Sequence, residues 1–121
     1  MSRVAGIRGA VSVEHNNRED ILSSTGRLLS QIAERNLIEV KDIVSVIFTA
    51  TPDLNAAFPA EAARQMGWAS VALMDAVEIN VPGSMPQVVR ILMHVNVPED
   101  FKSTHVFLGK CEKLRPDLSG K

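Results

Sequence analysis

Apolar and polar side chains alternate most regularly in residues 87–95, and this period of two predicts a β-strand. One face of this strand is wholly apolar, whereas the opposite face carries Arg90 among aliphatic neighbours. Because a guanidinium keeps its charge, an arginine in the middle of a strand needs an anionic partner. We interpret that partner as partly a bound ligand.

A second strand with the same feature is predicted for residues 4–13. Arg8 lies on its less apolar face, between Gly6 and Gly9, which leave space or allow a close backbone approach. A salt bridge at the rim of the sheet would explain one such arginine. Two arginines on two strands of a small domain favour a site for an anion.

Two helices are predicted between the strands. Apolar residues at helical spacing run from a cap at Asn17 to about Arg35, and they favour a long helix that covers the core. Residues 58–67 favour a short helix, because Pro59 suits its first position and Gly67 suits its end.

Three further segments are predicted to be strands. Residues 43–50 are apolar on nearly both faces, which is typical of an interior strand, and residues 68–73 and 105–108 are shorter candidates. This order of elements predicts an α+β fold, in which a mixed five-stranded sheet has two helices packed on one face. The other face, with Arg8 and Arg90, is left without cover by its own chain. We therefore expect that face to meet another subunit.

Length and composition exclude several classes of protein. The 121 residues predict a single domain, residues 1–121, with residues 115–121 as a flexible tail. A net charge of −1 gives no basic excess for nucleic acid. No apolar run approaches the roughly 20 residues that span a bilayer, and the first residues, Met1-Ser2-Arg3-Val4, are not expected to belong to an apolar signal segment. We expect a cytoplasmic protein, and its single cysteine, Cys111, fits a reducing compartment.

The common catalytic motifs are missing from the sequence. It has no glycine-rich phosphate loop and no nucleophile elbow, and its three histidines are scattered, so we expect no cofactor and no metal. The pair Glu61 and Arg64, three residues apart, is expected to be a local surface ion pair. A small, rigid polyanion would suit the side chains that remain, which are Arg8, Arg64, Arg90, Arg115, Glu78, Phe58 and Phe107.

Five segments together resemble the monofunctional, trimeric chorismate mutases of bacilli and related bacteria. The resemblance covers nearly the whole chain in order, and the all-helical chorismate mutases have a different pattern. The segments are Gly6-Ile7-Arg8-Gly9-Ala10, the run Ala50-Thr51-Pro52-Asp53-Leu54 followed by Ala57-Phe58-Pro59-Ala60, Val89-Arg90-Ile91, His105-Val106, and Leu114-Arg115-Pro116-Asp117-Leu118.

The resemblance implies a homotrimer that forms a pseudo-α/β barrel, with active sites in the clefts between neighbouring chains. The implied reaction is the rearrangement of chorismate to prephenate, which leads to phenylalanine and tyrosine and needs no cofactor. The implied roles place Arg90 at the ether oxygen, Glu78 at the ring hydroxyl and Arg8 at a carboxylate. The resemblance also implies a pocket whose remaining residues are Met74, Asp75, Ala76, Val77, Phe58, Ala60, Arg64, Phe107, Leu114 and Arg115.

Three positions depart from that family's usual residues. Phe107 stands where many members have tyrosine, Glu61 where a lysine is common, and Asp75 where a small polar residue is common. Two other functions therefore stay open from the sequence. One is a trimeric metabolite-binding protein that has lost turnover, and the other is hydrolysis of small imines or enamines on a similar scaffold.

Overall fold

The computed structural model describes residues 2–113. Two short 3-10 helices, η1 (Val40–Asp42) and η2 (Gly109–Lys113), accompany the longer elements. The predictions for Leu114, Arg115 and the tail at residues 115–121 lie outside the described residues. The helices and strands are β1 (Ser2–Ser12), α1 (Arg18–Asn36), β2 (Ile43–Ala50), α2 (Ala60–Gln65), β3 (Ala72–Val77), β4 (Val88–Pro98) and β5 (Val106–Leu108).

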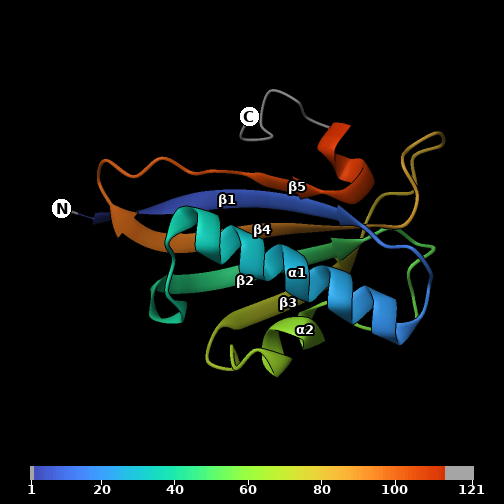
Figure 1. Ribbon diagram of the computed structural model, residues 1–121, viewed down its shortest axis with the longest axis horizontal. Coiled ribbons are helices and arrows are strands. Elements are labelled where there is room, and N and C mark those ends of the chain that lie inside the picture. Colours follow the sequence, from blue (N-terminus) through green and yellow to red (C-terminus); the bar gives the residue numbers. More distant parts are fainter. Residues whose placement is uncertain (1, 114–121) are drawn as a thin grey trace.

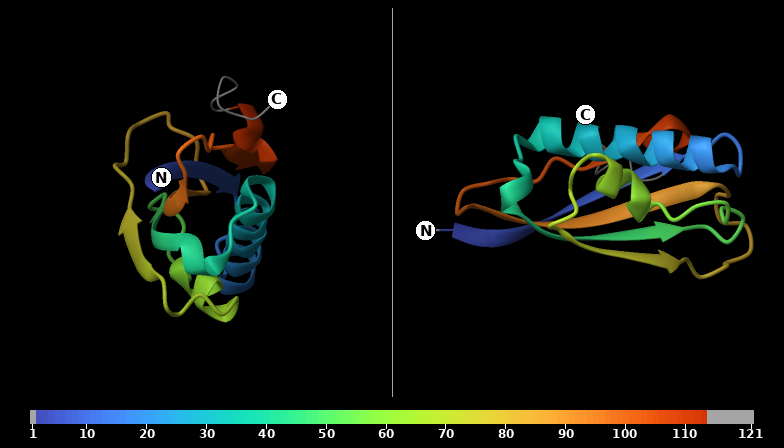
Figure 2. Two further views of the ribbon diagram at one scale, coloured as in Figure 1. Left: turned by 90° about the vertical axis from the view of Figure 1, so that its left-hand side faces the viewer. Right: turned by 90° about the horizontal axis from the view of Figure 1, so that it is seen from below.

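Within the described residues, five strands form one mixed sheet in the order β3-β2-β4-β1-β5. The central strand β4 is antiparallel to β1 and β2, whereas the outer strands β5 and β3 are parallel to β1 and β2 respectively. Helices α1 and α2 lie on the same side of this sheet (Figures 1 and 2). The predicted α+β class, with two helices on one face of a mixed five-stranded sheet, is confirmed.

Helix α1 begins at the predicted cap and packs closely on β1. The side chain of Asn17 accepts the backbone N–H of Asp20 at 2.7 Å, which satisfies a donor of the first turn. The helix ends before Leu37, whose φ of 54° lies in the left-handed region. Gly9 permits the close approach predicted for it, because a Cβ there would lie 2.8 Å from Cδ1 of Ile32.

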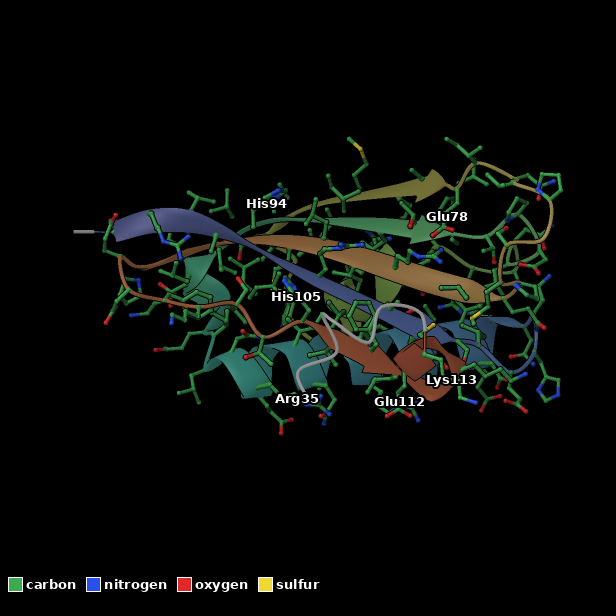
Figure 3. All side chains as sticks on the ribbon, turned by 90° about the horizontal axis from the view of Figure 1, so that it is seen from above. Arg35, Glu78, His94, His105, Glu112 and Lys113 are labelled. Carbon is green, nitrogen blue, oxygen red and sulfur yellow. The ribbon has the colours of Figure 1, made fainter. Side chains whose placement is uncertain are left out.

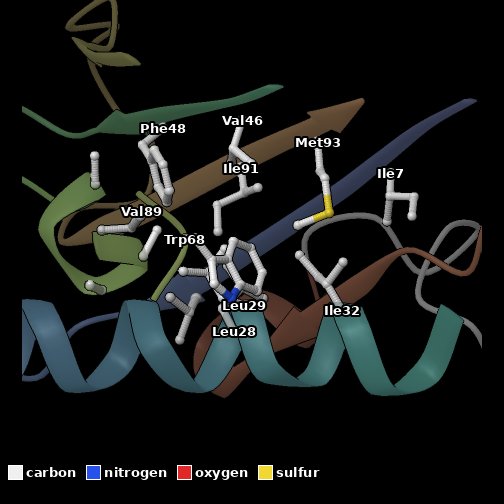
Figure 4. Close-up of a cluster of buried hydrophobic side chains, with 14 of the residues drawn as sticks. Ile7, Leu28, Leu29, Ile32, Val46, Phe48, Trp68, Val89, Ile91 and Met93 are labelled. Carbon is white, nitrogen blue, oxygen red and sulfur yellow. The ribbon is translucent and has the colours of Figure 1, made fainter. Parts of the chain in front are cut away.

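The hydrophobic core fills the space between the two helices and the sheet (Figure 4). The apolar face predicted for β4 points into it, and Phe48 on β2 is fully buried. Burial of this apolar surface is the main favourable contribution to folding. The largest fully buried side chains of the core are Ile7, Ile21, Leu28, Leu29, Ile32, Phe48 and Met93.

The prediction of a third strand at residues 68–73 is wrong, because β3 spans Ala72–Val77. Trp68 and Val71 are buried, but they belong to a turn in which the backbone N–H of Val71 donates to the carbonyl of Trp68. Buried apolar residues in a turn can therefore give the same sequence pattern as a short strand. The true strand lies at the sheet edge and is mostly exposed, so its alternation gives little signal.

Other boundaries differ by a few residues. The first strand was predicted for residues 4–13 but runs over Ser2–Ser12, and β5 starts one residue after His105. Strand β4 runs over Val88–Pro98 rather than the predicted residues 87–95. Pro98 is tolerated because the pairing of β4 with β2 reaches only Val95, which leaves this end of β4 an edge on one side.

Within residues 2–113, most of the sheet face opposite α1 and α2 is uncovered (Figure 2), but η2 packs on it at Ala10, Val88 and Phe107, where the prediction of a bare face is wrong. Apolar side chains on it are exposed, including Val4 on β1, Leu92 on β4 and Met74, which is 63% exposed on β3. An uncovered apolar sheet face is typical of a surface that contacts another protein chain. In the part of the chain that the structure describes, neither helix has the length and apolar character needed to cross a membrane.

Candidate active site

Arg90 lies in a row of residues that crosses the whole sheet. It is opposite Ala10 on β1 and opposite Thr49 on β2. Phe107 is the neighbour of Ala10 on β5, and Ala76 is the neighbour of Thr49 on β3. Residues opposite one another in a ladder share a face, so this row lies on the uncovered face.

Glu78 is the anionic partner of Arg90 within the chain. It follows the last residue of β3, and its backbone N–H donates to the carbonyl of Ala50 at 2.9 Å. Its Oε1 accepts a hydrogen bond from Nη1 of Arg90, and its Oε2 accepts one from the hydroxyl of Thr49 at 2.6 Å. Figure 3 shows Glu78 at the end of the sheet where β2 and β3 stop.

The Arg90–Glu78 pair is accessible from outside the chain. The side chain of Arg90 is 36% exposed and that of Glu78 is 17% exposed. A guanidinium that is partly screened from water, beside one carboxylate, keeps donors for an incoming anion. The pair is therefore open to solvent, and Glu78 is an anionic partner of Arg90 within the chain.

Arg8 lies on the same face as Arg90 and is exposed. It stands opposite Leu92 on β4, so it is a diagonal neighbour of Arg90 across the ladder. Its backbone N–H donates to Nδ1 of His105 at 2.9 Å, which ties β1 to the segment before β5. Within residues 2–113, its guanidinium makes no hydrogen bond or ion pair. Burial, and next the charge of Arg8, lower the pKa of His105.

A second group of predicted residues surrounds a hollow at the β3 edge. The hollow has a volume of about 240 Å³, and Phe58, Asp75, Ala76 and Val77 contribute to its lining. Phe58 is 67% exposed at the entry to α2. On β3, Asp75 and Val77 point to the side opposite Met74 and Ala76. The predicted pocket residues of one chain therefore fall on two sides of the sheet.

Asp75 is held at the entrance to α2. Its Oδ1 accepts the backbone N–H of Ala60 at 2.9 Å, while Arg64 is exposed on the same helix. Partial burial raises the pKa of Asp75, and the hydrogen bond from Ala60 and the charge of Arg64 oppose that shift. A carboxyl group therefore borders the hollow.

The expected ion pair between Glu61 and Arg64 is replaced by another. Glu61 on α2 accepts two hydrogen bonds from the guanidinium of Arg18 at the start of α1. This bond to Arg18 lowers the pKa of Glu61. Glu61 pairs with Arg18 because α1 and α2 pack side by side, so that the guanidinium of Arg18 can donate to both carboxylate oxygens of Glu61.

Phe107 and Cys111 are buried away from solvent. Phe107 is 6% exposed and packs with Ala10, Val88 and Cys111 in a small apolar cluster. Phe107 is therefore the β5 member of the Arg90 row, and because η2 packs on it, it does not form an open wall. Burial raises the pKa of the Cys111 thiol to about 11, so it is a thiol rather than a reactive thiolate at neutral pH.

Sequence reasoning missed two residues that hold this site. Thr49 binds the Glu78 carboxylate, and His105 binds the main chain of Arg8. The available signal for Thr49 is weak: with Ser45, it is one of two polar residues on one face of a strand that is otherwise apolar. Among the described residues, no three His, Cys, Asp or Glu side chains gather in a way that could hold a metal ion.

Comparisons with known proteins identify the family. The family model for chorismate mutase type I matches residues 4–118. Chorismate mutase AroH of Thermus thermophilus is 47% identical over 118 residues, covering 95% of this chain and 96% of that protein. Chorismate mutase AroH of Bacillus subtilis (strain 168) is 43% identical over 119 residues, covering 96% of this chain and 93% of that protein.

A solved structure agrees with these sequence matches. The chorismate mutase from Clostridium thermocellum has a TM-score of 0.85 and is 49% identical, and the match covers 89% of this chain and 97% of that chain. The chain therefore belongs to the type I chorismate mutase family. It is an isomerase with chorismate mutase activity, and the binding-protein and hydrolase alternatives are not favoured.

Proposed function

We propose that the protein rearranges chorismate to prephenate in a cleft between adjacent subunits of a cytoplasmic homotrimer. Arg90 contacts the ether oxygen, Glu78 accepts from the ring hydroxyl, and Arg8 holds a carboxylate. The observation that carries the proposal is the partly exposed Arg90–Glu78 pair on the uncovered sheet face, with Arg8 beside it. These residue types in this arrangement suit a small dianion.

Arg90 supplies the electrostatic part of the mechanism. In this rearrangement the carbon–oxygen bond lengthens before the new carbon–carbon bond is complete, so negative charge builds on the ether oxygen. A fixed guanidinium at that oxygen binds the transition state more strongly than the substrate. Strand β4 is paired on both sides at Arg90, so the backbone that carries the guanidinium is held in place.

Arg8 and Glu78 supply the conformational part. The reaction breaks and forms bonds within one molecule, so no nucleophile and no proton transfer is required of the protein. The substrate must instead be held in the compact, pseudo-diaxial shape in which its reacting ends meet. A cation at a carboxylate and an acceptor at the ring hydroxyl favour that shape over the extended one.

The division of the predicted residues supports a cleft shared by two chains. Arg8, Arg90 and Glu78 gather on the uncovered face, whereas Phe58, Asp75 and the hollow lie at the β3 edge towards α2. One chain alone does not bring Arg8 and Phe58 together. A neighbouring subunit that presents its β3 edge and Phe58 to the arginines would complete the pocket and cover exposed apolar surface.

The experiment is a direct assay of the parent protein and of Arg90→Lys. The parent is expected to deplete chorismate absorbance with formation of prephenate. Lysine keeps the charge but lacks the planar fork, so kcat of Arg90→Lys is expected to fall by at least about 100-fold while the circular dichroism spectrum is unchanged. Near-normal turnover of the variant would contradict the role of Arg90. Binding of chorismate by the parent without conversion would contradict the proposed reaction.

A further inference from the structure

Thr49 on β2 holds one oxygen of the Glu78 carboxylate. Its hydroxyl donates to Oε2 at 2.6 Å, while Oε1 accepts from Nη1 of Arg90. Thr49 and Arg90 stand directly opposite each other in the β2–β4 ladder. The carboxylate therefore bridges two neighbouring strands, with one oxygen assigned to each strand.

The main chain of Glu78 is fixed by the same strand. Its backbone N–H donates to the carbonyl of Ala50, the residue after Thr49, at 2.9 Å. Glu78 is thus held by β2 at its backbone and at one carboxylate oxygen. Because β3 ends at Val77, these bonds determine where the carboxylate lies beyond the strand.

Glu78 binds Arg90 through one of its two carboxylate oxygens. Arginine and carboxylate favour a two-bond pairing in which both oxygens accept from the guanidinium. Here Oε2 accepts from Thr49, and no bond from the guanidinium to Oε2 is present. Among the described residues, the bond from Nη1 to Oε1 is the one hydrogen bond that the Arg90 guanidinium makes. Its other N–H groups stay available for a ligand.

We propose that Thr49 is a positioning residue of the active site, which keeps Glu78 from engaging Arg90 through both carboxylate oxygens. Without the hydroxyl, the carboxylate rotates onto the guanidinium and takes a second donor that the ether oxygen needs in the transition state. The loss then appears in kcat more than in KM. The inference rests on the roles proposed above for Arg90 and Glu78.

Ser45 provides a matched control on the same strand. It lies on the same face as Thr49, and its hydroxyl contacts Nδ1 of His94 at 3.0 Å. His94 and Glu78 lie towards opposite ends of the sheet (Figure 3). Both residues carry a half-buried hydroxyl on β2. The hydroxyl of Thr49 binds Glu78, whereas that of Ser45 binds a residue distant from Glu78, so Ser45 serves as the control.

The test compares Thr49→Val, Thr49→Ser and Ser45→Ala in the chorismate assay, with the unfolding midpoint measured for each. Valine keeps the shape of threonine without its hydroxyl, so kcat is expected to fall by about tenfold or more. Serine restores the hydroxyl and is expected to restore most of kcat. Ser45→Ala is expected to turn over like the parent. A Thr49→Val enzyme with parental kcat, or a Thr49→Ser enzyme as slow as Thr49→Val, would overturn the proposal.

A double-mutant cycle separates positioning from a general structural effect. In a Glu78→Ala background there is no carboxylate to capture Arg90, so adding Thr49→Val is expected to change kcat by less than about twofold. An equal loss in both backgrounds would show that Thr49 does not act through Glu78. An inactive parent would overturn the proposed function together with this role, whereas an active parent with an insensitive Thr49 would overturn the role of Thr49 alone.

Discussion

Asp75 brings a carboxyl group to the hollow beside Phe58, where a dianionic substrate is proposed to bind. One of its oxygens accepts the N–H of Ala60, so the group also stabilises the first turn of α2. Its pKa is raised by burial, which shows that the surroundings disfavour the charged form. Asp75 thus stabilises α2, and we expect its charge to weaken the binding of an anion in the hollow.

We predict that Asp75→Asn lowers the KM for chorismate by about threefold to tenfold, because a like charge near the dianion is removed. The amide oxygen can still accept the N–H of Ala60, so kcat and the unfolding midpoint are expected to stay near those of the parent. Asp100→Asn removes the same charge from an exposed turn and should leave KM unchanged. An unchanged or raised KM in Asp75→Asn would show that this carboxyl group does not face the substrate.

His105 gives the protein a pH-dependent contribution to stability. Its pKa is lowered from 6.5 by burial and by Arg8, so the unfolded chain takes up the proton first. The free energy of unfolding is therefore expected to fall as the pH decreases through 6.5 towards the folded-state pKa. Urea unfolding of the parent and of His105→Asn at several pH values tests this. If both proteins lost equal stability in acid, His105 would not be the cause.

At the scale of elements, replacing Gly9, which packs against α1, and Gly26, which lies within α1, by alanine should change the free energy of unfolding in opposite directions. At Gly9 on β1 a Cβ would lie 2.8 Å from Ile32 and 3.1 Å from Leu28, whereas at Gly26 within α1 nothing lies within 4 Å. We predict that Gly9→Ala lowers the free energy of unfolding by about 1–3 kcal/mol through overpacking. Gly26→Ala should raise it by about 0.5–1 kcal/mol through helix propensity. Urea titration measures both, and a Gly9→Ala protein as stable as the parent would contradict the packing described.

Elements with a strong period could be predicted from the sequence. Helix α1 and strands β2 and β4 bury one regular stripe or face, so their apolar spacing reports their structure directly. Strand β3 escaped prediction because it is an edge strand with little burial. The pairing of Glu61 with Arg18 depends on how α1 and α2 pack, since 43 residues separate the two, and local spacing carries no information on it.

The same limit applies to the site. Arg8 and Arg90 could be found because a permanent charge in the middle of an apolar strand stands out from its pattern. Glu78 could be assigned only through the family resemblance, since its place beside Arg90 depends on the end of β3. Thr49 was missed because a threonine is an ordinary strand residue. Its role follows only from the register of β2 with β4.

At the scale of the whole molecule, the uncovered sheet face and the divided site have one common explanation. Arginines on one chain and the Phe58 hollow on its neighbour form each proposed cleft, so a trimer contains three clefts made from pairs of chains. Arg90→Ala should disable one half of a cleft, and Phe58→Asp, which places an anion in the hollow, should disable the other. Each variant alone is expected to be nearly inactive.

The most direct test of this account is the activity of trimers that mix the two variants. Co-expression with two affinity tags and purification on both tags gives only mixed trimers. Either composition contains one cleft with intact Arg90 from one chain and intact Phe58 from the next, so about one third of the parental activity is expected to return. Mixed trimers no more active than the separate variants would contradict a cleft shared between the arginines of one chain and the hollow of its neighbour.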